Sequence, residues 1–256
     1  MSNMFQSCSS LTYLNLDNFD TSKVTSMSSM FHLCKSMISL DLSHFKTENV
    51  VEIYRMFENC ESLKIINLSN FKTSKIKDFS YMFSFCTSLK SLDLSSFDTN
   101  RGTKMSGMFT YCQSLTSLNI KNFDTSQVTE MESMFSFMNS ITEIDLSSFN
   151  TSSVRGMRNL FRYNENLISL DLSHFDTSNV NTFEAMFQGC KTLKSLDLTN
   201  FDLSNVITFY NMFDELDNLT VIMNDDAKDN ELFVEEIPEN VIINYRKLIL
   251  NKSFNI

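Results

Sequence analysis

Apolar residues along the chain follow two alternating spacings, and each spacing predicts a different element. In residues 88–100, SLKSLDLSSFDTN, the apolar positions are Leu89, Leu92, Leu94 and Phe97. The alternation at Leu92 and Leu94 predicts a short strand with one buried face. A polar turn follows, usually FDTS, whose side chains can cap backbone N–H groups. Apolar residues then recur at three- and four-residue steps, which predicts a short helical or 3₁₀ segment. In one such stretch they are Val24, Met27, Met30, Phe31, Cys34 and Met37.

This unit of one strand and one helical segment repeats with a strict period. A Phe in an MF motif recurs every 26 residues, at Phe5, Phe31, Phe57, Phe83, Phe109, Phe135, Phe161, Phe187 and Phe213. A second Phe column runs from Phe19 to Phe201 with the same period. One unit cannot bury its own apolar face, whereas stacked copies form a continuous core. Residues 1–224 therefore predict an α/β repeat solenoid of about nine strands, with a parallel sheet on the concave face and helical segments on the convex face.

Residues 225–256 depart from the repeat and predict a capping segment. Pro238 should end a helix, and Val241 to Tyr245 read as a strand. We interpret this region as a degenerate tenth coil, because a bare parallel edge would invite aggregation. The chain begins in the middle of a unit, which truncation of a longer repeat array explains best. End-to-end self-association is the alternative.

The repeat pattern LDLSxFDTSxVTxMxxMFxxC over residues 1–224 resembles a known family. It is similar to the BspA-like leucine-rich repeat of bacterial surface proteins, including mycoplasma ones, and of protist proteins. Phe97 and its equivalents stand where leucine-rich repeats usually carry a buried Asn ladder. The resemblance implies a non-enzymatic protein-binding or adhesion module at a cell surface, with a host or neighbouring-cell protein as partner. The alternatives are an intracellular leucine-rich-repeat scaffold and a glycan-binding surface.

Composition narrows the classes of partner and compartment. The 256 residues include 24 Phe and 16 Met but only four Gly and one Pro, so polar side chains must build most turns. The formal net charge of −10 argues against nucleic acid and anionic membranes as partners. No apolar stretch is long enough to insert into a membrane. The N-terminal residues show no signal peptide, which leaves a cytoplasmic location open.

All six cysteines occupy one slot of the repeat, at Cys8, Cys34, Cys60, Cys86, Cys112 and Cys190. Other coils place Met138, Asn164 and Leu216 in this slot, which a metal ligand or a nucleophile would not tolerate. We expect buried free thiols that act as small apolar fillers. Disulfides between adjacent coils and thiol chemistry are the alternatives. The Met of the MF motif is interpreted as core.

The outward positions of the predicted strands are the candidate binding surface. They comprise Tyr13, Asn15, Asp41, Asn67, Asp93, Asn119, Glu143, Asp145, Asp171 and Asp197. Asp145, Asp171 and Asp197 should repel one another unless a weak divalent cation or a basic partner screens them. The alternative is that the strip is only a soluble face copied by duplication. A repetitive surface suits a repetitive ligand, such as a glycan or a fibrous protein, better than one small molecule. Enzyme signatures are absent from the sequence, and we expect no cofactor and no dedicated metal site.

Overall fold

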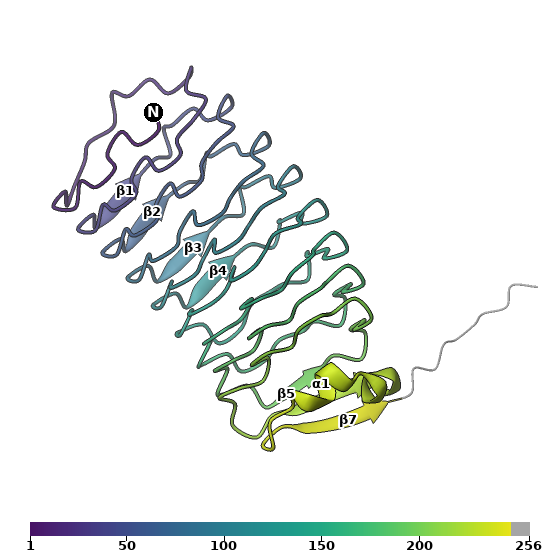
Figure 1. Ribbon diagram of the computed structural model, residues 1–256. Coiled ribbons are helices and arrows are strands. Elements are labelled where there is room, and N and C mark those ends of the chain that lie inside the picture. Colours follow the sequence, from purple (N-terminus) through teal and green to yellow (C-terminus); the bar gives the residue numbers. More distant parts are fainter. Residues whose placement is uncertain (247–256) are drawn as a thin grey trace, which may run out of the picture.

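The structure is a computed structural model that describes residues 1–246. The chain winds into a β-solenoid of about eight turns, stacked along one axis from the N-terminal end to a small C-terminal helix (Figure 1). Each turn is one 26-residue coil: coil 1 is 1–26, coil 2 is 27–52, and so on to coil 8, 183–208. Among the described residues no helix is long and apolar enough to cross a membrane. The last part of the predicted capping segment, 247–256, lies outside the described residues.

The predicted parallel strands are present but short, and their ladder is interrupted. The strands of the coils are β1 (Ser39–Asp41), β2 (Ile65–Asn67), β3 (Ser91–Asp93), β4 (Ser117–Asn119), β5 (Ser195–Asp197) and β6 (Thr220–Asn224). Parallel pairing joins β1 to β2, β3 to β4, and β5 to β6. The strands predicted around residues 13–15, 143–145 and 169–171 do not form paired strands. The placement of the strands on a concave face stays a prediction.

The predicted helical segment in each coil is wrong, because residues such as 27–34 form hydrogen-bonded turns instead. Ser29 and Leu33 have positive φ angles of 55° and 63°. The N–H groups of Ser29, Phe31 and Leu33 donate to carbonyls of the next coil, at 2.9 Å in each case. The N–H groups between them, such as that of Met30, donate three residues back along the chain. We call this part of each coil the turn segment.

The turn segments stack into a ladder that joins every pair of neighbouring coils, from coil 1 to the incomplete coil 9 that begins at residue 209. Each carries two left-handed residues, and all but Gly107 and Gly189 are L-residues with a side chain. A left-handed residue with a Cβ costs roughly 1–2 kcal/mol. The inter-coil hydrogen bonds and the packing below the ladder must offset that cost.

The core lies between the turn segments and the strands. The Met and Phe of the MF motif are fully buried from coil 2 onward, and Phe31, Phe57 and Phe83 stack with ring centroids 5.7 and 5.5 Å apart. The second Phe column is also buried from Phe45 onward, and the rings of Phe71 and Phe97 stack at 6.3 Å. This second column is the aromatic spine that the sequence places where leucine-rich repeats carry Asn.

A buried threonine ladder fixes the polar corner between the strand and the next turn segment. Thr99 is 1% exposed, and its Oγ1 donates to the Asp124 carbonyl at 2.9 Å and accepts the Asp124 N–H at 2.8 Å. The same Thr position accepts a backbone N–H from the next coil at seven consecutive corners. Sequence reasoning assigned this Thr only a local capping role. Leu203 ends the ladder.

The C-terminal end is covered by 3₁₀ helix η1 (Asp225–Asp229), helix α1 (Glu231–Glu235) and strand β7 (Ile242–Arg246). Phe233 of α1 lies edge-on against Phe209 and Phe213, with centroid distances of 5.3 and 6.3 Å. Strand β7 pairs in parallel with β6 and extends that sheet to three strands. Helix α1 ends before Pro238, and β7 lies close to the strand predicted from the sequence.

Removing the hydroxyl from the threonine ladder should destabilise the solenoid. Thr99→Val keeps the shape but leaves the Asp124 N–H and carbonyl without a partner, so we expect a loss of about 1–3 kcal/mol in the free energy of unfolding. Thr99→Ser retains the hydroxyl and should lose less. Urea denaturation followed by circular dichroism measures both. Equal losses for Val and Ser would show that packing, rather than the hydroxyl, stabilises the corner.

Gly107 should be intolerant of alanine because of a neighbouring ring as well as its left-handed backbone. A Cβ on Gly107 would lie 2.5 Å from the Tyr81 ring, whereas Ser133 holds the same left-handed conformation one coil later. Gly107→Ala should lower the free energy of unfolding by about 1–3 kcal/mol through overpacking. In a Tyr81→Ser background, which removes the ring, the same change should cost less, because only the backbone cost of a left-handed alanine remains. Equal destabilisation in both backgrounds would assign the effect to the backbone instead.

Candidate functional site

The ten candidate residues share one exposed strip, which we call the strand face. Eight of the ten side chains are exposed, and Asn67 and Asn119 are half-buried. They lie at two outward positions of each coil, those of Ser39 and Asp41 in β1. Successive coils place equivalent residues side by side, as the pairs Ser39–Ile65 and Asp41–Asn67 show. The structure therefore brings the predicted residues together as a line, not as a pocket.

Most Asp and Asn residues of the strand face have a local structural role. The Oδ1 atoms of Asp41, Asp93 and Asp171 accept the backbone N–H two residues on, at 2.9, 2.9 and 3.0 Å. Asn15 and Asn67 accept the equivalent N–H in the same way, at 2.9 and 3.2 Å. An amide oxygen and a carboxylate oxygen serve equally as acceptors in such a turn. This explains why Asp and Asn interchange along the column.

The charges of these carboxylates persist at neutral pH. The Ser43 N–H and hydroxyl hold the pKa of Asp41 below its ordinary value, and Ser173 does the same for Asp171. The pKa of Asp145 is lowered first by the Ser147 hydroxyl, 2.6 Å away, and then by the Ser147 N–H. Lowered pKa values therefore keep Asp41, Asp93, Asp145 and Asp171 of the strand face ionised at neutral pH.

Some carboxylates are partly neutralised by neighbours. Asn119 donates through its amide to Oδ1 of Asp93 at 2.9 Å. Nη1 of Arg246, in β7, lies 3.9 Å from Oδ2 of Asp197. Within residues 1–246, no three His, Cys, Asp or Glu side chains are grouped so as to hold a metal ion.

A shallow hollow on the strand face lies where the strand ladder is interrupted between β4 and β5. Glu143, Asp145 and Asp171 line it together with the hydroxyls of Ser117 and Ser169. Its carboxylates form no ion pair in the described structure. The hollow is open and polar, so it offers a surface for contact rather than an enclosed site.

Three exposed apolar residues interrupt the polar strip at its N-terminal end. Tyr13 and Ile65 are each 67% exposed and Ile38 is 47% exposed. The backbone of Ile38 bonds to Thr12 at 3.2 Å and to Lys64 at 2.9 Å, so the three residues lie in consecutive coils. We call Tyr13, Ile38 and Ile65 the apolar patch. Sequence reasoning placed Tyr13 on the candidate surface; Ile65 stands at the same outward position two coils later, and Ile38 occupies the position just before the strand.

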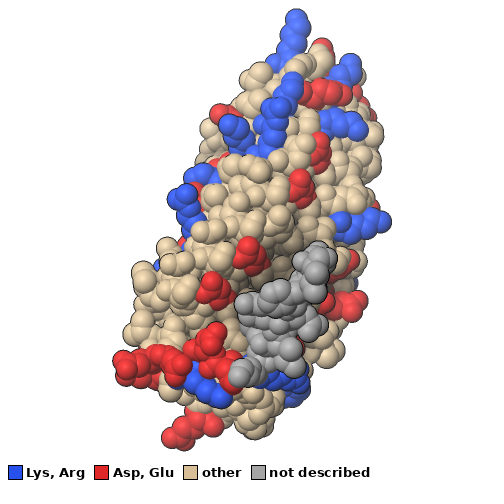
Figure 2. Space-filling model, turned by 90° about the vertical axis from the view of Figure 1, so that its right-hand side faces the viewer, with Lys and Arg blue, Asp and Glu red and all other residues tan. Residues whose placement is uncertain are grey.

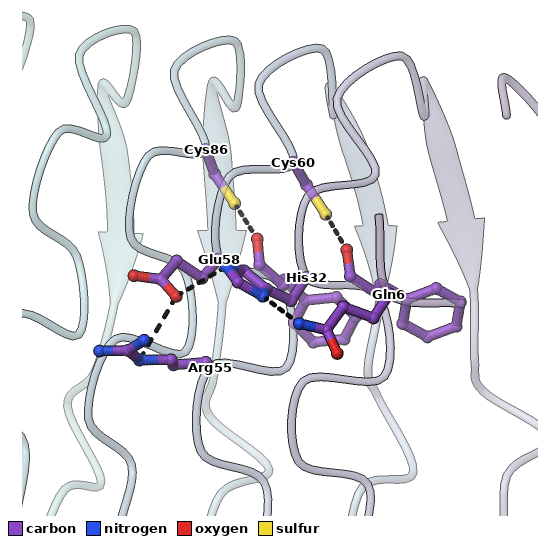
Figure 3. Close-up of polar contacts among 8 residues, drawn as sticks. Gln6, His32, Arg55, Glu58, Cys60 and Cys86 are labelled. Atoms are coloured by element: carbon purple, nitrogen blue, oxygen red, sulfur yellow. Dashed lines mark hydrogen bonds and ion pairs between the residues drawn. The ribbon is translucent and has the colours of Figure 1, made fainter. Parts of the chain in front are cut away.

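The cysteines are free thiols, as expected, but Cys8 is exposed rather than buried, and the five buried thiols are more than apolar fillers (Figure 3). Cys60 Sγ donates to the Phe31 carbonyl at 3.2 Å, and Cys86 Sγ to the Phe57 carbonyl at 3.3 Å. Burial raises the pKa of Cys112 to about 12, so its thiol stays protonated at neutral pH. Asn164 takes over this donor role in its coil, with its amide 2.8 Å from the Phe135 carbonyl. The Cys column therefore satisfies a core carbonyl in successive coils.

A polar cluster crosses the first three turn segments beside the thiols (Figure 3). Gln6 Nε2 lies 3.2 Å from His32 Nδ1, and His32 Nε2 lies 3.2 Å from Glu58 Oε2. Arg55 Nε lies 3.4 Å from the same carboxylate oxygen. Burial lowers the pKa of His32, and the Arg55 charge lowers it further. Burial also raises the pKa of Glu58, and the Arg55 charge offsets part of that rise. The cluster ties coils 1 to 3 together on the side of the turn segments.

Comparison with known proteins identifies a family but no activity. A model of the family described as "Mycoplasma protein of unknown function, DUF285" matches residues 1–117, 63–143 and 137–230. The three overlapping matches cover nearly all of the repeats. No curated protein is significantly similar to the chain.

The Asp145 turn yields a test of how the strand face holds its charge. Because the Ser147 hydroxyl and N–H stabilise the ionised carboxylate, the pKa of Asp145 should lie below its ordinary value of 3.8. A lowered pKa stabilises the fold above the unfolded-state pKa, and that stability is lost as the pH falls through the folded-state pKa. Ser147→Ala should raise the Asp145 pKa and leave that of Asp171 unchanged, as measured by NMR titration of the carboxyl carbons. An unchanged Asp145 pKa would contradict the assignment.

Proposed function

The chain belongs to the DUF285 family of Mycoplasma proteins of unknown function, and we propose that it is a non-enzymatic protein-binding module. It acts in adhesion, through its strand face. Its repeat is of the BspA-like leucine-rich type, and its setting is a cell surface. Its partner is a protein of a host or neighbouring cell. The resemblance of the repeat to BspA-like surface proteins supports this setting by analogy.

The apolar patch is the observation that carries the proposal. Tyr13, Ile38 and Ile65 expose 67%, 47% and 67% of their surfaces in consecutive coils, where other coils present mostly Ser, Thr, Lys or Glu. Exposed apolar side chains rimmed by polar residues mark protein interaction sites, and aromatic anchors contribute most to binding. The patch is also where the repeat departs from uniformity without any gain in core packing.

The shape of the strand face favours a macromolecular partner over a small molecule. The candidate residues form a line along the axis, and the hollow at Glu143, Asp145 and Asp171 is open. Small-molecule sites instead enclose their ligand and converge unlike groups on it. A glycan site would stack sugars on aromatic faces, and on the strand face only Tyr13 offers one.

The test measures binding of the 256-residue protein, displayed on beads, to cultured epithelial cells. Tyr13→Ser with Ile65→Ser restores the Ser that several other coils carry at this position and disturbs no buried contact. We expect this double variant to lose binding by about tenfold or more, as hot-spot residues do. Ile168→Ser is the matched control, since Ile168 is 63% exposed and lies outside the apolar patch. It should bind like the unaltered protein.

Treatment of the cells separates the alternatives. Loss of binding after mild trypsin treatment supports a protein partner, whereas loss only after periodate oxidation would assign a glycan. The triple variant Asp145→Asn, Asp171→Asn and Asp197→Asn removes three charges but keeps the oxygen acceptors that cap the turns. It therefore measures how much the carboxylate charges contribute to binding. Absence of binding to any cell surface would refute the adhesion role and favour an intracellular scaffold.

A further inference from the structure

The polar corner of each coil forms a second exposed surface, distinct from the strand face. In each coil it comprises the six residues that follow the Phe of the second column, which are residues 46–51 in coil 2. The second and fifth of these, Thr47 and Val50 in coil 2, are buried. We call this surface the corner face. Its backbone is held in place by the threonine ladder, which accepts the N–H of Lys46, Lys72, Asp176 and Asp202 at 2.7 to 2.9 Å.

The solenoid is nearly neutral in its N-terminal part and acidic toward its C-terminal end, since residues 1–104 carry 11 Lys and Arg against 10 Asp and Glu, and residues 105–246 carry 8 against 21. Figure 2 shows Lys and Arg side chains mainly toward the N-terminal end and Asp and Glu gathered at the C-terminal end. On the corner face, coil 3 carries Lys72, Lys75 and Lys77, all exposed. The corners of coils 7 and 8 carry Asp176 and Asp202 and no Lys or Arg.

At the first position of the corner, the charges of coils 2 and 3 are opposite in sign to those of coils 7 and 8, which lie symmetrically about coil 5. The first position of the corner reads Asp20, Lys46, Lys72, Asp98, Asp124, Asn150, Asp176 and Asp202. Lys72 and Asp176 lie at equal distances from Asp124, because 124 − 72 and 176 − 124 are both 52 residues, or two coils. Lys46 and Asp202 are likewise each three coils away, since 124 − 46 and 202 − 124 are both 78.

The apolar residues of the corner face follow the same symmetry. Val51 is 45% exposed and Ile207 is 73% exposed, and both occupy the sixth position of the corner. Thr129 holds that position in coil 5, and 129 − 51 and 207 − 129 are both 78 residues. In the part of the chain that the structure describes, Lys46, Lys72, Asp176 and Asp202 take part in no ion pair.

We propose that the corner face binds a second copy of this chain in an antiparallel, two-fold symmetric dimer whose axis passes through coil 5. A face-to-face dyad perpendicular to the solenoid axis reverses the order of the coils and keeps equivalent corner positions opposite each other. Lys46 then faces Asp202 of the second copy, Lys72 faces Asp176, and Val51 faces Ile207. Each contact occurs twice, over a length of about 29 Å at a coil spacing of about 4.8 Å.

The charges favour this arrangement over its alternatives. A parallel dimer would place each lysine opposite the same lysine of the other copy, which is repulsive. In the antiparallel arrangement Asp98 faces the neutral Asn150 of the second copy. Among the charged first positions, only Asp124 faces the same residue of the second copy, because coil 5 lies on the two-fold axis. That contact lies beside Ser126 and Gln127, so its repulsion acts at a polar, hydrated centre and limits the affinity.

A charge-swap experiment tests the dimer with the full chain. Sedimentation velocity should show a dimer at about 50 mM salt that dissociates at about 500 mM, because the contacts are solvent-exposed ion pairs. The variants Lys46→Glu with Lys72→Glu, and Asp176→Lys with Asp202→Lys, each place like charges opposite one another in their homodimers. Each should weaken dimerisation by about tenfold or more.

Mixing the two variants should restore the dimer. In the mixed pair, the glutamates introduced at positions 46 and 72 of one chain face the lysines introduced at positions 202 and 176 of the other. The remaining half of the interface keeps its original lysines and aspartates. All four contacts, two between positions 46 and 202 and two between positions 72 and 176, therefore join opposite charges again. In two of them the positive and negative partners have changed places.

The control variant, Lys64→Glu with Lys90→Glu, makes the same change in net charge at exposed lysines outside the corner face. It should dimerise like the unaltered chain. A protein that is monomeric at low salt, a mixture that fails to dimerise, or a control that weakens as much as the corner variants would each overturn the proposal. Circular dichroism melting confirms that each variant is folded.

Discussion

The hydrogen bonds between turn segments are the constraint on which the rest of the structure depends. The N–H of Phe31 donates to the carbonyl of Met56, and this offset of 25 residues recurs from coil to coil. A single residue inserted within a turn segment would move the donors and acceptors of that coil out of register with both neighbouring coils. The strict 26-residue period is therefore a geometric requirement of the ladder. The strand ladder, by contrast, is broken into separate sheets of two or three strands and tolerates irregularity.

The sequence alone predicted the period, the parallel strands and the core, because these depend on apolar positions that are visible in the letters. It failed on the turn segments, since apolar steps of three and four residues suit a helix and these turns equally well. Left-handed residues are usually recognised by glycine. Here Ser29, Leu33 and Tyr81 adopt that conformation, held there by the stacked neighbours, so the decisive signal was absent from the sequence. The donor role of the thiols was hidden for a similar reason, since Cys60 reads simply as a small apolar residue.

The candidate surface that the sequence marks contains two groups of residues, which the structure separates by their contacts. Asp41, Asp93 and Asp171 recur because each closes the turn after its strand, a role that Asn fills equally well. Their regularity therefore follows from the fold, whatever binds there. The residues without a structural role, such as Ile38 with 47% of its surface exposed, are those that a partner can explain. Burial and hydrogen bonding, which only the structure supplies, separate the two groups.

The locked register has a consequence for how such a protein acquires binding surfaces. Residues 26 positions apart are neighbours in space, so a substitution changes one rung of a surface without disturbing the others. An apolar patch then needs only three altered rungs, as at Tyr13, Ile38 and Ile65. A change of charge along the axis needs only that Lys46 and Lys72 replace the Asp found at the same position in coils 7 and 8. Because the threonine ladder and the turn segments hold the backbone, these surface changes carry little penalty in folding, and the pattern of departures from the repeat is where function can be encoded.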